Sequence, residues 1–238
     1  MTSRTYVFVH GVWHGGWCWS RVADILRKRG HSVSSPTHTG LGERAHLLSA
    51  DITIQTFVED IVAHLQFEDI RDVVLVGHSF GGIPITGVAD LLPDRIAKLV
   101  YLDAIMLNSG ETWMDLLPED MARDRTELAR QTSGGLSLPP APPESFGVTH
   151  PQDVAFLQSR LTPHPFRTFT TALKLNNPIG NGIPAAYIEC ADPPYRPAKV
   201  ALERAKGFGW PVVQIASGHD AMVIEPLALA DILENDLP

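Results

Sequence analysis

The sequence contains few of the residues that build disulfide frameworks and metal centres. Its only cysteines among 238 residues are Cys18 and Cys190, which lie far apart and form no CxxC pair. We therefore expect both to be small buried hydrophobic residues without a disulfide. The ten histidines show no HExxH spacing and no cluster with cysteine. The sequence thus predicts no metal site and no cofactor.

Basic residues and long apolar runs are also scarce. There are 19 lysines and arginines against 27 aspartates and glutamates, which gives a formal net charge of −8, and no basic run is present. This balance argues against nucleic acid as the main partner, because phosphate binding needs clustered cations. No apolar run reaches the roughly 18 residues that cross a bilayer, and the first residues lead into a strand rather than a signal peptide. We expect a cytoplasmic protein that acts on a small molecule, with no membrane partner.

One stretch organises the chain, Asp72 to Gly82, with the sequence DVVLVGHSFGG. Its apolar, β-branched run predicts a buried strand, and the residues after it can begin a helix. Ser79 stands at the turn between the two, flanked by small residues that allow strand and helix to approach closely. A G-x-S-x-G pattern in this context is typical of a nucleophile elbow. We therefore expect Ser79 to be a catalytic nucleophile.

The rest of the chain alternates between patterns typical of strands and patterns typical of helices. Such alternation predicts an α/β fold, with a mostly parallel sheet and helices on both faces. Besides the elbow, the expected strands are residues 5–9, 31–35, 96–103, 185–190 and 212–215, and the expected helices are residues 20–29, 53–65, 197–206 and 226–233.

The alternation stops between residues 105 and 183. This segment has weak apolar periodicity, helical patches at 114–131 and 151–161, and the proline- and glycine-rich tract SGGLSLPPAPPESFG. We interpret it as an inserted, mainly helical cap subdomain. The predicted core then consists of residues 1–104 and 184–238.

Ser79 needs a base, because a serine hydroxyl is a poor nucleophile near neutral pH. In a parallel α/β sheet, catalytic residues gather on loops at the carboxyl ends of strands. The loop after the last expected strand, ASGHDAM, contains His219. Its late position matches the serine, acid, histidine order of enzymes with a nucleophile elbow. We therefore expect His219 to be the general base.

Two carboxylates compete for the role of the acid that orients His219. Asp103 ends the strand after the nucleophile strand, where an unpaired carboxylate is costly, so we expect it to have a specific partner. Asp192 follows the next strand, but Pro193 restricts its backbone to an extended conformation. We favour Asp103 and keep Asp192 as the alternative.

Backbone N–H groups near Ser79 complete the expected chemistry. They stabilise the developing oxyanion, a contribution of about 3 kcal/mol for each donor. One N–H comes from Phe80, the residue after the nucleophile, and another from Val12 in the glycine-rich loop after the first strand. Residues that follow a catalytic loop or open the cap are candidates for the substrate pocket: Trp13, Phe80, Met106, Trp113 and Met222.

Three segments, VHGVWHGGWCW, GHSFGG and the late GHDAM, together resemble the α/β-hydrolase superfamily. The resemblance is nearest to its plant methylesterase and hydroxynitrile lyase branch and to small bacterial esterase-like members. It covers essentially the whole chain, with the cap matched only in position and length. The elbow and the HG loop are specific to the superfamily and not to one substrate.

Three positions separate hydrolases from lyases in this branch. The lyases have a threonine in place of the loop glycine, a GES elbow, and a lysine after the catalytic histidine. This sequence has Gly11, His78 and Asp220 instead, so the resemblance implies a hydrolase.

The resemblance leaves the acid open. Methylesterases carry it in a CTxD-like segment after the penultimate strand, and the matching position here is Pro193, one residue past Asp192. Asp103 instead resembles the strand-end acid that some haloalkane dehalogenases have after the nucleophile strand.

Together these features predict a serine hydrolase that cleaves a small, mainly apolar or aromatic carboxylic ester through an acyl-enzyme. A carbamate or activated amide needs the same machinery, and no cationic cluster is present to bind a carboxylate or phosphate. The alternatives are a hydroxynitrile lyase-like C–C lyase, a ligand-binding protein on a hydrolase scaffold, and a cofactor-free oxygenase on the same fold.

Overall fold

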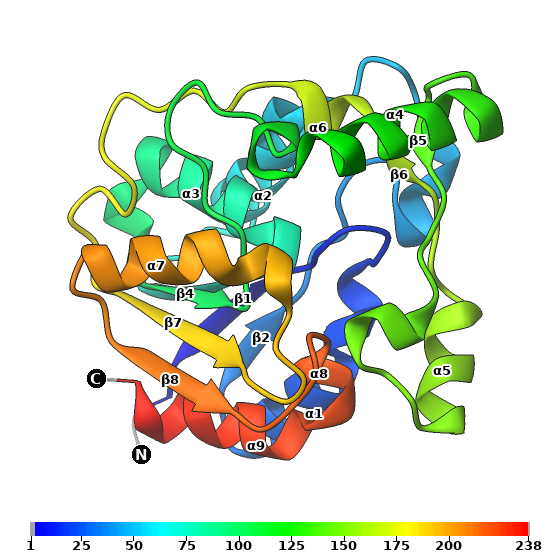
Figure 1. Ribbon diagram of the computed structural model, residues 1–238. Helices are drawn as coiled ribbons and strands as arrows, with labels where there is room; N and C mark the ends of the chain where they lie inside the picture. Colours follow the sequence, from blue (N-terminus) through cyan, green and yellow to red (C-terminus); the bar gives the residue numbers. More distant parts are fainter. Residues whose placement is uncertain (1–2, 238) are drawn as a thin grey trace.

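The structure is a computed structural model that describes residues 3–237. Six parallel strands form the central sheet in the order β2-β1-β3-β4-β7-β8 (Figure 1). They are β1 (Thr5–Val9), β2 (Ser32–Ser34), β3 (Val73–His78), β4 (Ile96–Leu102), β7 (Ala185–Cys190) and β8 (Val212–Ile215). The predicted α/β fold class is confirmed, and β1, β7 and β8 have the predicted bounds.

Helices cover both faces of this sheet (Figure 1). Two of them, α1 (Ser20–Lys28) and α9 (Pro226–Asp231), contact each other on one face, whereas α2 (Ile54–Phe67), α3 (Gly82–Leu91) and α7 (Lys199–Gly207) lie on the other. Four of them, α1, α2, α7 and α9, lie within a few residues of the bounds expected from sequence, and α3 follows the elbow, where a helix was expected to begin. No helix within residues 3–237 has the length and apolar character needed to cross a bilayer.

Local sequence explains where these elements begin and what they bury. At the start of α2, the N–H of Thr53 donates to Oγ1 of Thr56 at 3.1 Å, which satisfies one of the unpaired donors of a helix end. Phe57, on the apolar stripe of α2, is fully buried. Cys18 and Cys190 are buried and unpaired, as predicted.

Between β4 and β7 the alternation of strands and helices is interrupted. The segment contains η5 (Met114–Leu116), α4 (Glu119–Ser133), η6 (Pro143–Phe146), α5 (Pro151–Gln158) and α6 (Arg167–Thr170), with an antiparallel pair, β5 (Ser137–Leu138) and β6 (His164–Pro165). Here α4 begins five residues later than expected, because Leu117 and Pro118 adopt an extended backbone after η5. The division into core and cap subdomains stays a prediction.

Candidate active site

Ser79 lies at the junction of β3 and α3, on the first residue of a short 3-10 turn, η3 (Ser79–Gly81). Its φ of 53° is in the left-handed region, which is costly for a residue with a side chain. The turn is tight: a Cβ on Gly77 would lie 2.6 Å from the carbonyl oxygen of Gly81, and one on Gly81 would lie 2.5 Å from that of Val9. The two glycines of the pattern are therefore required by backbone approach.

His219 and Asp103 meet at the carboxyl edge of the sheet. Nδ1 of His219 donates to Oδ2 of Asp103 at 2.7 Å, and both side chains are buried. Asp103 directly follows β4 with a φ of 43°. Its N–H donates to the carbonyl oxygen of Ile188 in β7 at 2.7 Å. Because the neighbouring strand holds its backbone, the Asp103 carboxylate is a fixed partner for the His219 ring.

The second predicted acid, Asp192, is placed differently. Its side chain is exposed, and its N–H donates to the carbonyl oxygen of Ser217 at 3.1 Å. The carboxylate that bonds to the ring of His219 is that of Asp103. Of the two carboxylates left open by the sequence, the structure thus places the favoured one, Asp103, against His219.

Ser79 and His219 line the same narrow space, together with Val12 and Phe146. This space is too narrow to hold a water molecule. Two aromatic rings pack against His219: the centroid of the Tyr195 ring lies 3.7 Å from that of His219 in a stacked arrangement, and the centroid of the Phe146 ring lies 6.2 Å from it. A substrate therefore reaches Ser79 only after some of these side chains move.

Val12 and Phe80, the two residues predicted to donate N–H groups to an oxyanion, flank the nucleophile. Phe80 follows Ser79 in η3, and Val12 lines the narrow space from the loop after β1. A Cβ on Gly11 would lie 2.8 Å from Cβ of Ser79, which is closer than real Cβ contacts. Glycine at position 11 is thus what allows this loop to approach the nucleophile.

The predicted pocket residues are buried around this space rather than in its walls. Nε1 of Trp13 donates to the carbonyl oxygen of Leu138 in β5 at 3.0 Å. The ring of Trp113 lies 6.3 Å from that of Phe80, centroid to centroid. The lining of the narrow space does not include the predicted side chains Trp13, Phe80, Met106, Trp113 and Met222. Their contact with a substrate stays a prediction.

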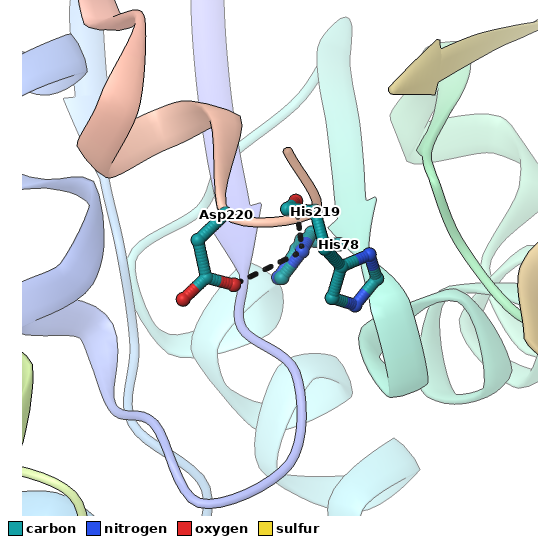
Figure 2. A group of neighbouring side chains, drawn as sticks. All are labelled: His78, His219 and Asp220. Carbon is teal, nitrogen blue, oxygen red and sulfur yellow. Dashed lines mark hydrogen bonds and ion pairs between the residues drawn. The ribbon is translucent and has the colours of Figure 1, made fainter. Parts of the chain in front are cut away.

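A second network lies beside His219 (Figure 2). Oδ2 of the fully buried Asp220 lies 3.1 Å from Nε2 of His14, and Nδ1 of His14 lies 2.7 Å from the carbonyl oxygen of Val12. Nε2 of His78 donates to the carbonyl oxygen of His219 at 3.0 Å and lies 3.7 Å from Oδ1 of Asp220. The network joins the loop after β1, the end of β3 and the loop after β8.

The charges of His14 and Asp220 offset the cost of burying this network. Burial lowers the pKa of His14, but the Asp220 carboxylate outweighs this effect, so the pKa of His14 is raised. Burial in turn raises the pKa of Asp220, but the charge and hydrogen bond of His14 reverse this, so the pKa of Asp220 is lowered. For His78, burial and the neighbouring His219 hold the pKa well below its ordinary value. Sequence reasoning did not identify this network, because its members show no local pattern.

His78, His219 and Asp220 also form the one group of possible metal ligands among residues 3–237, with donor atoms within 4.8 Å of one another. Two of the ring nitrogens already have partners: Nε2 of His78 bonds to the carbonyl oxygen of His219, and Nδ1 of His219 bonds to Asp103. These side chains therefore belong to a hydrogen-bonded network. The expectation of no metal stays a prediction.

Comparison with known proteins relates the chain to other sequences. The model of the alpha/beta hydrolase family matches residues 6–232. A carbendazim hydrolyzing esterase from Nocardioides sp. (strain SG-4G) is 37% identical over 239 residues, which cover 96% of this chain and 97% of that protein. Methylesterase 18 from Arabidopsis thaliana is 34% identical over 120 residues, which cover 50% of this chain and 44% of that protein.

Solved structures agree with this relationship. An extracellular alpha/beta-hydrolase from a Paenibacillus species, described as sharing homology with tobacco salicylic acid binding protein 2, superposes with a TM-score of 0.84 at 26% identity over 97% of both chains. Polyneuridine aldehyde esterase superposes with a TM-score of 0.73 over 99% of both chains, and at 19% identity this shows a shared fold alone. From the family match and the relative that aligns along nearly its whole length, this chain belongs to the alpha/beta hydrolase family.

Proposed function

We propose that this chain is a serine esterase that hydrolyses a small, mainly apolar or aromatic ester through an acyl-enzyme. The observation that carries the proposal is the hydrogen bond of 2.7 Å between His219 and Asp103, with Ser79 in the lining of the space that His219 also lines. A base oriented by a buried carboxylate, beside a serine on a strained turn, is the arrangement that activates a serine hydroxyl.

In the first half of the reaction, Oγ of Ser79 attacks the acyl carbon while Nε2 of His219 takes the hydroxyl proton. Asp103 accepts the Nδ1–H of His219 and stabilises the imidazolium that forms. The N–H groups of Val12 and Phe80 donate to the oxyanion. The bond from the acyl carbon to the leaving group then breaks, and the alcohol departs with the proton from His219.

In the second half, water releases the acyl group. His219 takes a proton from the water molecule as its oxygen attacks the acyl carbon, and the same N–H groups hold the new oxyanion. The bond to Oγ of Ser79 breaks, Ser79 regains a proton from His219, and the carboxylic acid leaves.

The surroundings of Ser79 and one relative support the substrate class. Val12 and Phe146 are the apolar residues in the lining of the space at the nucleophile, and contact with them favours an apolar or aromatic acyl or leaving group. The Nocardioides relative is named for hydrolysing carbendazim, a methyl carbamate of an aromatic ring system. We therefore include aromatic carbamates with esters in the proposed range.

Two observations favour hydrolysis over lyase chemistry. Position 11 has no room for a threonine as the loop stands, because even a Cβ there would lie 2.8 Å from Cβ of Ser79. Position 220, where the lyases have a lysine, holds a carboxylate that is already paired with His14. This chain thus has the buried carboxylate of Asp220 at the position where the lyases have the lysine that holds cyanide.

Labelling with a fluorophosphonate probe tests the proposal. We expect one adduct on Ser79, located by peptide mass spectrometry, and hydrolysis of p-nitrophenyl acetate and of carbendazim or related aromatic carbamates. Ser79→Ala should abolish labelling and lower turnover by at least about 1,000-fold, whereas the exposed control Ser145→Ala should not. Turnover that survives Ser79→Ala, or cyanide release from cyanohydrins without ester turnover, would overturn the assignment.

A further inference from the structure

His14 and Asp220 are buried residues with no step in the proposed reaction. Nδ1 of His14 lies 2.7 Å from the carbonyl oxygen of Val12, and Nε2 lies 3.1 Å from Oδ2 of Asp220. A carbonyl oxygen and an ionised carboxylate only accept hydrogen bonds, so a ring that bonds to both has to donate from both nitrogens. A histidine ring with two N–H groups is an imidazolium cation. The side chains of the pair are 2% and 0% exposed.

We propose that His14 and Asp220 form a buried imidazolium–carboxylate pair that holds the oxyanion loop (residues 10–16) in place against the loop that carries His219. The inference rests on the proposed esterase function and deepens it. It makes both residues positioning residues, because no step of the proposed reaction uses either side chain, although both line the narrow space together with Ser79.

On the oxyanion loop, the pair controls the peptide between Val12 and Trp13. The carbonyl oxygen of this peptide, which belongs to Val12, bonds to His14. The N–H of the same peptide, which belongs to Trp13, donates to Nδ1 of His164 at 3.2 Å. Trp13 has a φ of 64°, a strained conformation for a residue with a bulky side chain. The direction of the Val12 N–H depends on the backbone angles of this strained segment, so the contacts that hold the segment also aim the donor.

On the base loop, the bond to His14 holds the side chain of Asp220, the residue that directly follows His219. Figure 2 shows the two side chains pointing in different directions from adjacent positions, so the His219 ring stays available to Asp103. The carbonyl oxygen of His219 also accepts the hydrogen bond from Nε2 of His78 at 3.0 Å. The backbone of the base is therefore held from two sides without any contact that occupies its ring.

Among the titratable groups near the pair, His14 has the largest effect in lowering the pKa of Asp220, and His78 and His219 have smaller ones. The groups that face Asp220 or His14 are His10, Cys18, His78, His164, Cys190, Tyr195 and His219. Burial holds the pKa of His10, His78 and His164 well below the ordinary value and raises the pKa of both thiols and of Tyr195. Removal of His14 therefore leaves the Asp220 carboxylate beside His219 without its main balancing charge.

The charge state of His14 can be measured without substrate. In protein labelled with ¹⁵N-histidine, we expect both ring nitrogens of His14 to resonate as N–H of an imidazolium at pH 7, with the signals assigned by their loss in His14→Gln. In Asp220→Asn the ring should become neutral. A neutral His14 in the wild-type protein at pH 7 would refute the pair, whatever the outcome of esterase assays, so the two proposals fail separately.

The kinetic test uses a cycle of His14→Ala, Asp220→Ala and the double variant. We expect each to lower kcat by about 10- to 100-fold with KM changed less than about threefold, because the oxyanion donor and the base lose their alignment. In His14→Ala the acidic limb of the pH profile of kcat/KM should also move up by roughly one pH unit, because the bare Asp220 carboxylate stabilises the protonated base.

The double variant and a conservative variant separate positioning from a general loss of structure. In His14→Ala/Asp220→Ala the acidic limb should return to its wild-type position while kcat stays low. Asp220→Asn keeps an acceptor and should retain at least about tenfold more kcat than Asp220→Ala. If His14→Ala does not fold, the same shift of the acidic limb is measured in His14→Gln, whose side chain is also neutral. An unmoved acidic limb in folded variants, with kcat and KM altered alike, would show a merely structural role and overturn the proposal.

Discussion

Oδ2 of Asp103 accepts a hydrogen bond of 2.7 Å from Nδ1 of His219, a residue 116 positions later in the chain. The two residues meet because β4 and β8 are both parallel to β7, which lies between them, so their carboxyl ends reach the same edge of the sheet. Loops at that edge are where residues from distant parts of an α/β chain converge.

This contact predicts which carboxylate supports catalysis. Asp103→Asn should lower kcat for p-nitrophenyl butyrate by about 10³- to 10⁴-fold, because an amide does not stabilise the imidazolium and favours the wrong ring tautomer. Asp192→Asn, at an exposed position, should change kcat by less than about twofold. A greater loss in Asp192→Asn than in Asp103→Asn would contradict the geometry.

Close approach at position 11 predicts a second outcome. Gly11→Ala places a Cβ 2.8 Å from Cβ of Ser79 and 3.2 Å from Nδ1 of His78, so the loop or the nucleophile has to shift. We expect kcat to fall about 100-fold while the protein stays folded by circular dichroism. Gly207→Ala is the matched control, because an added Cβ there meets no atom within 4 Å. Equal activity of the two variants would show that the loop tolerates a side chain.

The narrow space beside Ser79 predicts how acyl size is limited. Phe146 lines that space and its ring lies 6.2 Å from that of His219, so Phe146→Leu should widen it. We expect kcat/KM for p-nitrophenyl butyrate relative to the acetate to rise by about tenfold. Phe156→Leu is the control, since Phe156 lies in α5, where its ring packs against that of Trp17 and is not part of that lining. An unchanged ratio in Phe146→Leu would mean that other side chains set acyl size.

Buried histidines predict acid sensitivity of the fold. Burial holds the pKa of His10, His78 and His164 well below 6.5. In the unfolded chain these rings take up protons near pH 6.5, so unfolding binds protons and the free energy of unfolding falls as the pH drops below about 6.5. Each ring contributes a loss of up to about 1.4 kcal/mol per pH unit.

Urea unfolding at pH 7.5, 6.0 and 5.0 measures this loss. His164→Gln should reduce the dependence on pH by about one proton, whereas the exposed His150→Gln should leave it unchanged. The raised pKa of His14 acts with the opposite sign, because its contribution is present below pH 6.5 and is lost as the pH rises through that raised value. Stability that does not decline from pH 6.5 to 5 would contradict the burial of three neutral rings.

Much of the fold follows from local pattern. The expected strands at 5–9, 185–190 and 212–215 match β1, β7 and β8, because strands of a parallel sheet read as short, mainly apolar runs. The family indicated by the HG loop, the elbow and the late GHDAM segment is also confirmed. The short elements β5, β6, α6 and α8 (Ala221–Ile224) were not predicted, since so few residues show no helical period and none of the four lies in an expected strand.

By itself, the sequence determined the α/β class and a serine in a tight turn between strand and helix, because these depend on neighbouring residues. Only the tertiary structure decided that His219 bonds to Asp103 and that Asp220 bonds to His14. These partners are 116 and 206 positions apart. Their contact depends on strand order and on the direction of loops at one edge of the sheet, and no local periodicity records either of them.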